Sequence, residues 1–365
     1  MSIVESLKLI EKNAKRRRAK RGTDLQEVWH NCGLKVRAES GQTLYPLTIK
    51  RREEDYGYSL LLHLPHGLSD VSFRSRRHQL AWALGGDVEI EPVNGQLFLR
   101  VLTGAMPKRK DYHFADTGNM VMPVPIGYGR EGLIMLDLAD APHLLLGGGS
   151  GAGKSNWLHQ AIVTLLQANV SVYIIDLKRL EFAAYKKHAV CVFKEPESLE
   201  ILQAVNREME RRMELLESAG VVKIQDYPGG LPYIAVVIDE ISELQDDKAW
   251  TILNRLVRLA RALGISVVAA TQRPSTKVID GDTRALFTAR ISFRVADKVN
   301  SQIILDGPQA AYLPTTPGRA IYRFGDRCRE VQTMFLPVAQ VREVLSTIPP
   351  RPPEPVQQPT IKPGG

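Results

Sequence analysis

A glycine-rich loop at residues 148–155 constrains the fold of this chain more than any other segment. Its sequence is Gly148-Gly149-Ser150-Gly151-Ala152-Gly153-Lys154-Ser155, which fits the pattern G-x-x-x-x-G-K-[ST]. A buried-strand run at 142–146 precedes it and a helical pattern at 156–167 follows. In this context glycine N–H groups and a helix N-terminus surround phosphate oxygens. The loop therefore predicts a nucleoside triphosphate site, with Lys154 on the β- and γ-phosphates and Ser155 on Mg²⁺.

Two carboxylates follow a second apolar run. Residues 233–238 have the composition of a buried strand, and Asp239 and Glu240 come directly after it. Ligands of α/β sheets bind at the carboxyl ends of strands. There, Asp239 is placed to support Mg²⁺ through its water shell, and Glu240 to orient and deprotonate the attacking water. The pair alone is typical of a helix N-cap, but together with the loop it predicts a hydrolytic site.

Polar residues also end two further strand-like runs. Gln272 follows the run 265–271, and from there it could hydrogen-bond the γ-phosphate or the attacking water as a sensor of nucleotide state. Lys178 follows the run that ends at residue 175, and it could approach nucleotide or DNA. The alternatives are an ordinary polar strand end for Gln272 and helix capping for the 176–181 segment.

Two arginines flank the run 291–295. A site that hydrolyses a nucleotide between subunits needs a cation at the transition state, often an arginine supplied in trans. Arg290 is the first candidate for that role and Arg294 the second. A surface ion pair is the competing interpretation for either residue.

The order of these patterns predicts four segments. Residues 1–44 form a basic helical arm and connector, and residues 45–105 a small α+β module with a hairpin turn at Asn94-Gly95. In residues 118–346 strand-like runs alternate with amphipathic helices, which predicts an α/β domain with a mostly parallel sheet. Residues 347–365 are rich in proline and predict an extended, disordered tail.

Charge and composition narrow the class of partner. The chain has 48 basic and 40 acidic residues, a net charge of +8, which favours an anionic partner and nucleic acid first. The basic residues of the first 21 positions form either a solvated helix face or a nucleic-acid-binding arm. The longest apolar runs are far shorter than the roughly 20 residues of a membrane span. Three cysteines far apart in sequence give no disulfide framework, which favours the cytosol.

Four segments together resemble the motor domain of the FtsK/SpoIIIE DNA translocases. They are residues 142–156, 234–240, 269–275 and 288–293. The resemblance covers about residues 118–337, in order and at similar spacing. It implies a RecA-like P-loop fold, ATP and Mg²⁺ as cofactors, and a hexameric ring that encircles duplex DNA and moves it. The module at 45–104 is similar to the region before the motor in translocases and coupling proteins of integrative conjugative elements.

The resemblance also implies a role for each matching residue. The nucleotide would be held by Gly148, Gly149, Ser150, Gly151, Ala152, Gly153, Lys154, Ser155 and Asn156. Mg²⁺ would be held by Ser155 and Asp239. Catalysis would use Lys154, Glu240, Gln272 and Arg290, the last in trans. A pore-facing DNA loop would carry Arg273, Lys277 and Arg284.

The sequence departs from the family pattern at several positions. Gln302 stands where the family often has arginine, and residues 314–317 replace a more glycine-rich turn. We expect no membrane anchor before the motor and no winged-helix module after it.

These observations lead to one main hypothesis and two alternatives. The main hypothesis is a cytoplasmic, Mg²⁺-dependent ATPase that moves DNA, with duplex favoured, through an oligomeric ring in the transfer or maintenance of a mobile genetic element. One alternative is the ATPase of a protein-export system. The other is a nucleotide-gated coupling adaptor that recruits DNA or a relaxase to a secretion pore.

Overall fold

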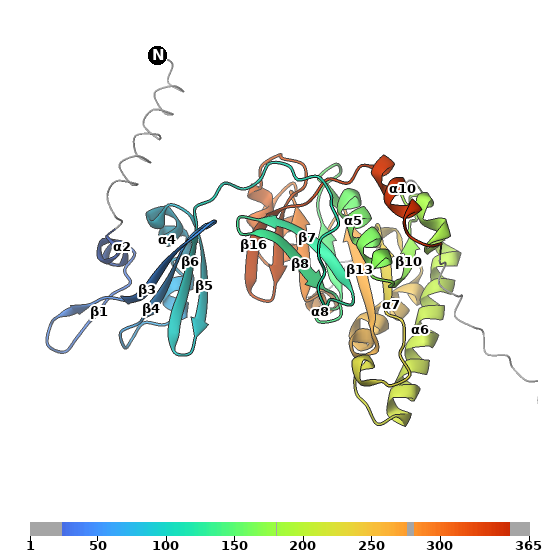
Figure 1. Ribbon diagram of the computed structural model, residues 1–365, viewed down its shortest axis with the longest axis horizontal. Coiled ribbons are helices and arrows are strands. Elements are labelled where there is room, and N and C mark those ends of the chain that lie inside the picture. Colours follow the sequence, from blue (N-terminus) through green and yellow to red (C-terminus); the bar gives the residue numbers. More distant parts are fainter. Residues whose placement is uncertain (1–23, 180, 276–280, 351–365) are drawn as a thin grey trace, which may run out of the picture. The chain divides into compact units, whose positions relative to one another are not determined.

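The computed structural model describes residues 24–179, 181–275 and 281–350, and the chain divides into two compact units, Met1–Ala105 and Met106–Gly365 (Figure 1). The predictions of a basic helix at 1–21 and a disordered tail, and the candidate DNA contact Lys277, lie outside the described residues. The first unit has one hydrophobic core, and the second has two.

The first unit contains a four-stranded antiparallel sheet in the order β3-β4-β6-β5. The four strands are β3 (Leu47–Glu54), β4 (Gly57–His63), β5 (Asp87–Val93) and β6 (Gln96–Leu102). Two short strands of the unit, β1 (Val36–Arg37) and β2 (Thr43–Leu44), pair with each other in a separate antiparallel sheet. The helices of the unit are α2 (Leu25–Asn31), α3 (Asp70–Arg74) and α4 (Arg77–Leu84). Asn94 and Gly95 both have positive φ, which joins β5 to β6 through a two-residue turn and confirms the predicted hairpin.

The core of the first unit lies between the sheet and its helices. Trp29 of α2 packs against Phe73 of α3 with ring centroids 5.7 Å apart, so the segment before residue 45 belongs to this unit. The helical stretch before Gly85 consists of two helices, α3 and α4, with a break between them. At the break the Ser75 hydroxyl and the Arg76 guanidinium both donate to the carbonyl of Ser72, which then accepts from side chains.

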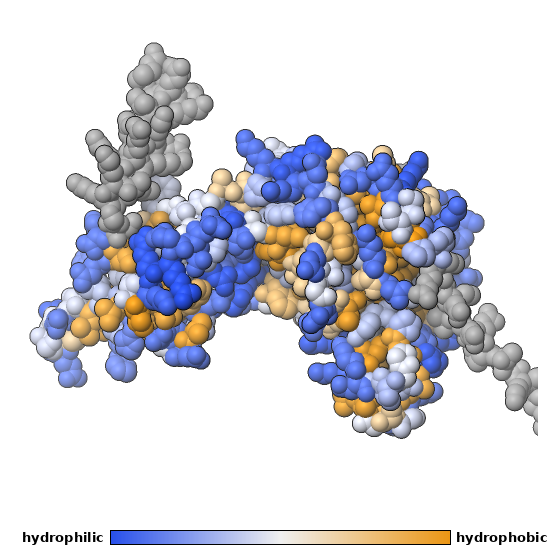
Figure 2. Space-filling view, in the orientation of Figure 1, coloured by the Kyte–Doolittle hydropathy of each residue, from blue (hydrophilic) through white to orange (hydrophobic). Residues whose placement is uncertain are grey.

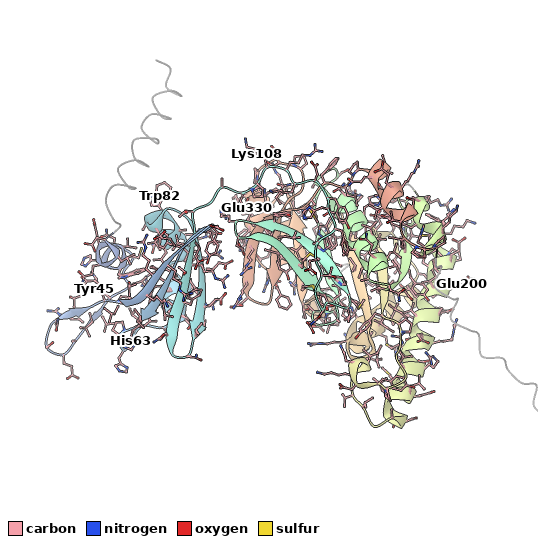
Figure 3. The ribbon with its side chains drawn as sticks, viewed as in Figure 1. Tyr45, His63, Trp82, Lys108, Glu200 and Glu330 are labelled. Atoms are coloured by element: carbon pink, nitrogen blue, oxygen red, sulfur yellow. The ribbon has the colours of Figure 1, made fainter. Side chains whose placement is uncertain are left out.

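The surface of the first unit is mostly hydrophilic on the face drawn in Figure 2. Leu47 and Ile49, on the edge strand β3, are exposed apolar side chains of this unit. Trp82 is 79% exposed and projects from α4 away from the sheet (Figure 3).

The second unit contains a ten-stranded sheet, counted over its described residues, in the order β11-β10-β12-β13-β9-β14-β15-β16-β7-β8. Its strands are β7 (Pro123–Gly129), β8 (Gly132–Asp137), β9 (Leu144–Gly147), β10 (Ser171–Ile175), β11 (Val190–Val192), β12 (Ile234–Ile238), β13 (Ile265–Thr271), β14 (Ala289–Phe293), β15 (Arg319–Phe324) and β16 (Arg327–Gln332). The strands from β11 to β14 in this order are parallel, and the remaining pairings are antiparallel. The predicted α/β class with a mostly parallel sheet is confirmed.

Helices cover both faces of this sheet (Figure 1). They are α5 (Lys154–Gln167), α6 (Glu195–Ser218), α7 (Asp247–Leu259), α8 (Gly281–Leu286), α9 (Lys298–Leu305) and α10 (Val338–Ser346). Single 3₁₀ turns are η1 (Ala183–Lys187), η2 (Ile224–Asp226), η3 (Ile241–Glu243), η4 (Ala260–Leu263) and η5 (Gln309–Tyr312).

Alternate strand residues enter the two cores on either side of the sheet. Leu144 and Leu146 pack in the cluster that contains α5, whereas Leu145 packs in the cluster that contains α6 and α7. Strands buried on both faces are continuously apolar, which is why the short runs in the sequence indicated the parallel part of the sheet. Within the described residues, no helix is both long and apolar enough to cross a membrane.

Candidate functional site

The glycine-rich loop lies between β9, which ends at Gly147, and α5, which begins at Lys154. Gly148 has φ 152° and Gly153 has φ 122°, conformations that residues with a Cβ rarely adopt. A Cβ on Gly148 would lie 2.7 Å from Cβ of Phe293, which packs against the loop. The loop therefore needs glycine for its backbone conformation and for the close approach of β14.

Backbone hydrogen bonds fix the loop to the rest of the sheet edge. The Gly149 N–H donates to the carbonyl of Arg294, and the Gly318 N–H donates to the carbonyl of Ala152. The N···O distance is 3.0 Å in both hydrogen bonds. The exit of β14 and the entry of β15 are thus tied directly to the predicted phosphate loop.

Lys154 is folded back over this loop. Its Nζ donates to the carbonyls of Gly148 at 2.5 Å and Gly149 at 3.0 Å. Burial lowers the pKa of Lys154 to about 8, although the nearby carboxylates of Glu240 and Asp239 act in the opposite direction. The ammonium is therefore poorly solvated here, and a bound phosphate would be a strong competing partner for it.

The neighbouring position Asn156 is tied to another segment. Its side-chain amide donates to the carbonyl of Leu336 at 2.7 Å and accepts from the Leu336 N–H at 3.2 Å. The side chain thus connects α5 to the chain just before α10.

The two predicted carboxylates lie at the end of β12 and are 6% and 4% exposed for Asp239 and Glu240. Burial raises the pKa of Asp239 to about 6, and the negative charges of Asp176, Glu240 and Glu181 add to this effect. Burial also acts to raise the pKa of Glu240, but hydrogen bonds from Lys178, Ser242 and the Gln272 N–H outweigh it and leave that pKa below its usual range.

This donor set fits a magnesium ion. Neighbouring carboxylates add to the raised pKa of the buried Asp239, a repulsion that a divalent cation would relieve, and Mg²⁺ prefers oxygen ligands. The Asp239 carboxylate and the Ser155 hydroxyl, at the first turn of α5, are the groups that would hold it. The bound ion would neutralise charge on the phosphates of the nucleotide.

Gln272 follows β13, the strand next to β12. Its backbone N–H donates to both Glu240 oxygens, at 2.9 and 3.1 Å, and its side chain is exposed at the same edge. The next residue, Arg273, is also exposed. The structure thus brings Gln272 into direct contact with Glu240 through its backbone.

Two residues of the 176–181 segment have roles that the sequence did not reveal. The buried Asp176 carboxylate accepts from the N–H groups of Arg179, Glu181 and Phe182 and so builds the turn after β10. Lys178 Nζ donates to Glu240 Oε2 at 2.9 Å. The only signal in the sequence was that both residues follow a strand on the expected side of the sheet.

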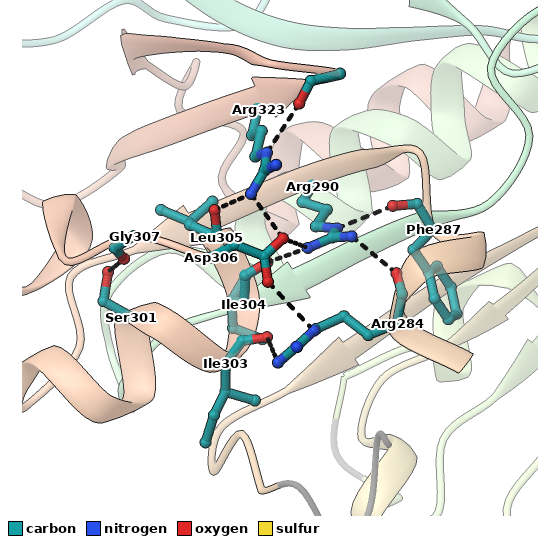
Figure 4. A network of polar contacts seen from close by, with 11 residues as sticks. Arg284, Phe287, Arg290, Ser301, Ile303, Ile304, Leu305, Asp306, Gly307 and Arg323 are labelled. Atoms are coloured by element: carbon teal, nitrogen blue, oxygen red, sulfur yellow. Dashed lines mark hydrogen bonds and ion pairs between the residues drawn. The ribbon is translucent and has the colours of Figure 1, made fainter. Parts of the chain in front are cut away.

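Arg290 lies away from this edge, in a network around Asp306 (Figure 4). Its guanidinium donates to Asp306 at 2.7 Å and to the carbonyls of Phe287, Ile304 and Arg284. The last three carbonyls of α9 each accept from a different arginine: Ile303 from Arg284, Ile304 from Arg290 and Leu305 from Arg323. Cations at a helix C-terminus oppose its dipole, so this cluster stabilises the end of α9.

Two residues with a predicted functional role belong to this network. Arg290 has a side chain only 9% exposed and donates to Asp306 and three backbone carbonyls, an arrangement that favours a structural role over a trans role. Arg284, a candidate DNA contact, is also engaged by Asp306 at 3.4 Å. Arg294, the second candidate for a trans arginine, has an exposed side chain directly after β14.

We expect Arg290→Ala to lower the free energy of unfolding by about 3 kcal/mol, because removing the nearly buried guanidinium leaves three backbone carbonyls and the half-exposed Asp306 without that donor. The value lies at the low end of the usual range since Asp306 keeps two other arginines. Chemical denaturation of the variant measures the change, with Arg294→Ala as the exposed control. If Arg290→Ala unfolds like the wild type but cannot turn over ATP, the structural role is wrong and the trans role is supported.

The chain is similar in sequence to a known protein family. The FtsK/SpoIIIE family model matches residues 108–244. The DNA translocase FtsK of Chlorobaculum tepidum is 32% identical over 263 residues, which cover 64% of this chain and 33% of that protein. The FtsK of Treponema pallidum is 36% identical over 214 residues, 53% of this chain and 27% of that protein. The chain spans about a third of the length of these curated relatives.

Solved structures share the fold at lower identity. A monomer of the pCW3 conjugation coupling protein TcpA with ATPγS aligns with a TM-score of 0.64 and 23% identity, covering 88% of this chain and 97% of that chain. The cytoplasmic domain of the type VII secretion ATPase EccC of Thermomonospora curvata aligns with a TM-score of 0.57 and 23% identity, covering 68% and 33%. The fold of the second unit is therefore that of RecA-like P-loop ATPases, and residues 108–244 within it match the FtsK/SpoIIIE family model.

Proposed function

We propose that the chain is a Mg²⁺-dependent ATPase that works as a ring in the cytoplasm and moves DNA through its pore. One observation carries the proposal: Lys154, Asp239 and Glu240 converge at one sheet edge within a domain whose matching relatives are DNA translocases. The net charge of +8 supports an anionic track, because contacts to phosphates are largely electrostatic.

The residues of the site would divide the work as follows. Lys154 leaves its own loop carbonyls to bind phosphate, and Ser155 with Asp239 holds the metal. Bound Mg²⁺ supplies charge neutralisation at the phosphates. Glu240 accepts a proton from the attacking water, and Gln272, whose N–H contacts Glu240, passes the change to Arg273 and the loop that follows. That loop would contact the DNA backbone through Arg273, Lys277 and Arg284.

A role on a mobile genetic element is part of this proposal. It is supported by the similarity in fold to a conjugation coupling protein over 88% of this chain, including residues before the motor. Partners of the ring would then include a relaxase or the proteins of a secretion pore.

Protein export is the second candidate, because the same fold occurs in the EccC secretion ATPase. A nucleotide-gated adaptor is the third. The fold does not distinguish these functions, whereas the sequence relatives and the charge favour DNA.

ATP hydrolysis by the purified chain tests the proposal. We expect linear duplex DNA to stimulate the rate, increasingly with length, and added salt to weaken the effect. The same assay without DNA, with single-stranded DNA, with closed circular duplex and with EDTA provides the controls. Stronger stimulation by single strands would change the track to single-stranded DNA. A chain that binds and hydrolyses ATP but responds to no DNA would contradict the DNA motor.

A further inference from the structure

An ion pair connects the proposed base to the neighbouring strand end. Lys178 follows β10 and Glu240 follows β12, and these strands pair in parallel with Ile175 opposite Ile238. The ammonium lies 2.9 Å from Glu240 Oε2, and the two side chains are 28% and 3% exposed. The pair therefore joins a nearly buried carboxylate to a partly solvated cation.

Glu240 accepts from three donor groups in this arrangement. Oε2 accepts from Lys178 and from the Gln272 N–H, and Oε1 accepts from the Ser242 hydroxyl at 2.7 Å and from the same N–H. A carboxylate has about four lone-pair sites in all. A general base needs one of them directed at the water whose proton it takes. Three donors leave at most about one site for a water, so Glu240 is poorly placed to act as a base in this state.

Of the three donors, Lys178 can most easily break its hydrogen bond to Glu240. Gln272 contributes a backbone N–H next to a fully buried strand, and Ser242 lies two residues from Glu240. The turn below Lys178 is fixed by Asp176, but the lysine side chain itself is a flexible stem with a compact charge. Its positive charge is also close enough to Lys154 to act on the pKa of that ammonium, after the larger effect of burial.

We propose that Lys178 is a positioning residue that holds Glu240 in a resting arrangement, and that nucleotide phosphate competes for the Lys178 ammonium and releases the carboxylate to face the attacking water. This inference rests on the proposed ATPase function. It gives the motor a restraint on hydrolysis that is removed only when the site is correctly filled.

The first test is DNA-independent hydrolysis. Lys178→Met removes the charge at similar length and is expected to raise the basal rate about tenfold at ATP concentrations well below KM, because there the wild type must break the ion pair for each ATP that binds. Lys178→Arg keeps the ion pair and is expected to restore most of the restraint. Lys187→Met, an exposed lysine on the same segment, is the matched control. A Lys178→Met rate at or below that of the wild type would overturn the inference.

The second test measures the pair without turnover. The variants Lys178→Met, Glu240→Gln and the double variant form a thermodynamic cycle for unfolding in denaturant, run with and without ATPγS. We expect a favourable coupling between the two residues in the nucleotide-free chain and its loss with ATPγS bound. Equal coupling in both states would exclude release by nucleotide. A wild type that never hydrolyses ATP would instead refute the proposed function, and this cycle would still report on the pair.

Discussion

Glu240→Gln is expected to reduce steady-state ATP hydrolysis by at least about a hundredfold, because a positioned general base contributes roughly that much or more. Glutamine keeps the size of the side chain and an acceptor oxygen for the Gln272 N–H and the Ser242 hydroxyl, so the edge of β12 should remain folded. The variant should therefore still bind ATP. Hydrolysis is measured by phosphate release, and binding by titration with a fluorescent ATP analogue.

Glu243→Gln is the matched control for this variant. Glu243 is an exposed carboxylate three residues further along, in η3. Its replacement should leave both binding and hydrolysis close to those of the wild type. Near-normal turnover in Glu240→Gln would remove Glu240 from the role of base, and loss of ATP binding in that variant would mean that the carboxylate serves the fold of the site instead.

The part of the site that could be predicted from sequence is the part whose geometry is local. The glycine positions, Lys154 and Ser155 are adjacent in the chain, so a strand, a loop and a helix in succession fix how they lie. The Asn94-Gly95 turn is predictable for the same reason, since a two-residue loop determines its own backbone conformation. In both cases the chain neighbours supply the whole physical argument.

The rest of the site depends on which strands become neighbours. Lys178 and Glu240 are 62 residues apart, and they meet only because β10 pairs with β12. Arg290 looks in the sequence like a free cation beside a strand. Its partners come from α9 and from the segment before β14, and these positions follow from the packing of α9 against β14.

Prediction of the sheet from sequence is limited in the same way. Alternation of strands and helices predicts its parallel part, where each strand is followed by a crossover. The antiparallel part is different, because β7 and β8 come first in the unit yet pair beyond β16 at one edge. Their position is set by pairing between segments about 200 residues apart in the sequence.

Lys154→Ala is expected to abolish detectable ATP hydrolysis and to weaken ATP binding by at least about tenfold. The ammonium is buried against the loop carbonyls of Gly148 and Gly149, where a charge-assisted hydrogen bond to phosphate is stronger than in water. Because alanine is a good helix former at the first position of α5, the fold should tolerate the change. Calorimetric titration with ATPγS measures the affinity, and phosphate release measures the rate.

Lys186→Ala supplies the comparison, since this exposed lysine carries the same charge on η1 and lies outside the phosphate loop. It should bind ATPγS and hydrolyse ATP as the wild type does. A comparison of the two variants separates ATP binding from ATP hydrolysis. Lys154→Ala should lose affinity together with turnover, whereas Glu240→Gln should lose turnover alone. If Lys154→Ala instead kept full affinity and full turnover, the loop would not be the phosphate site, and the assignment of Mg²⁺ to Ser155 and Asp239 would lose its basis as well.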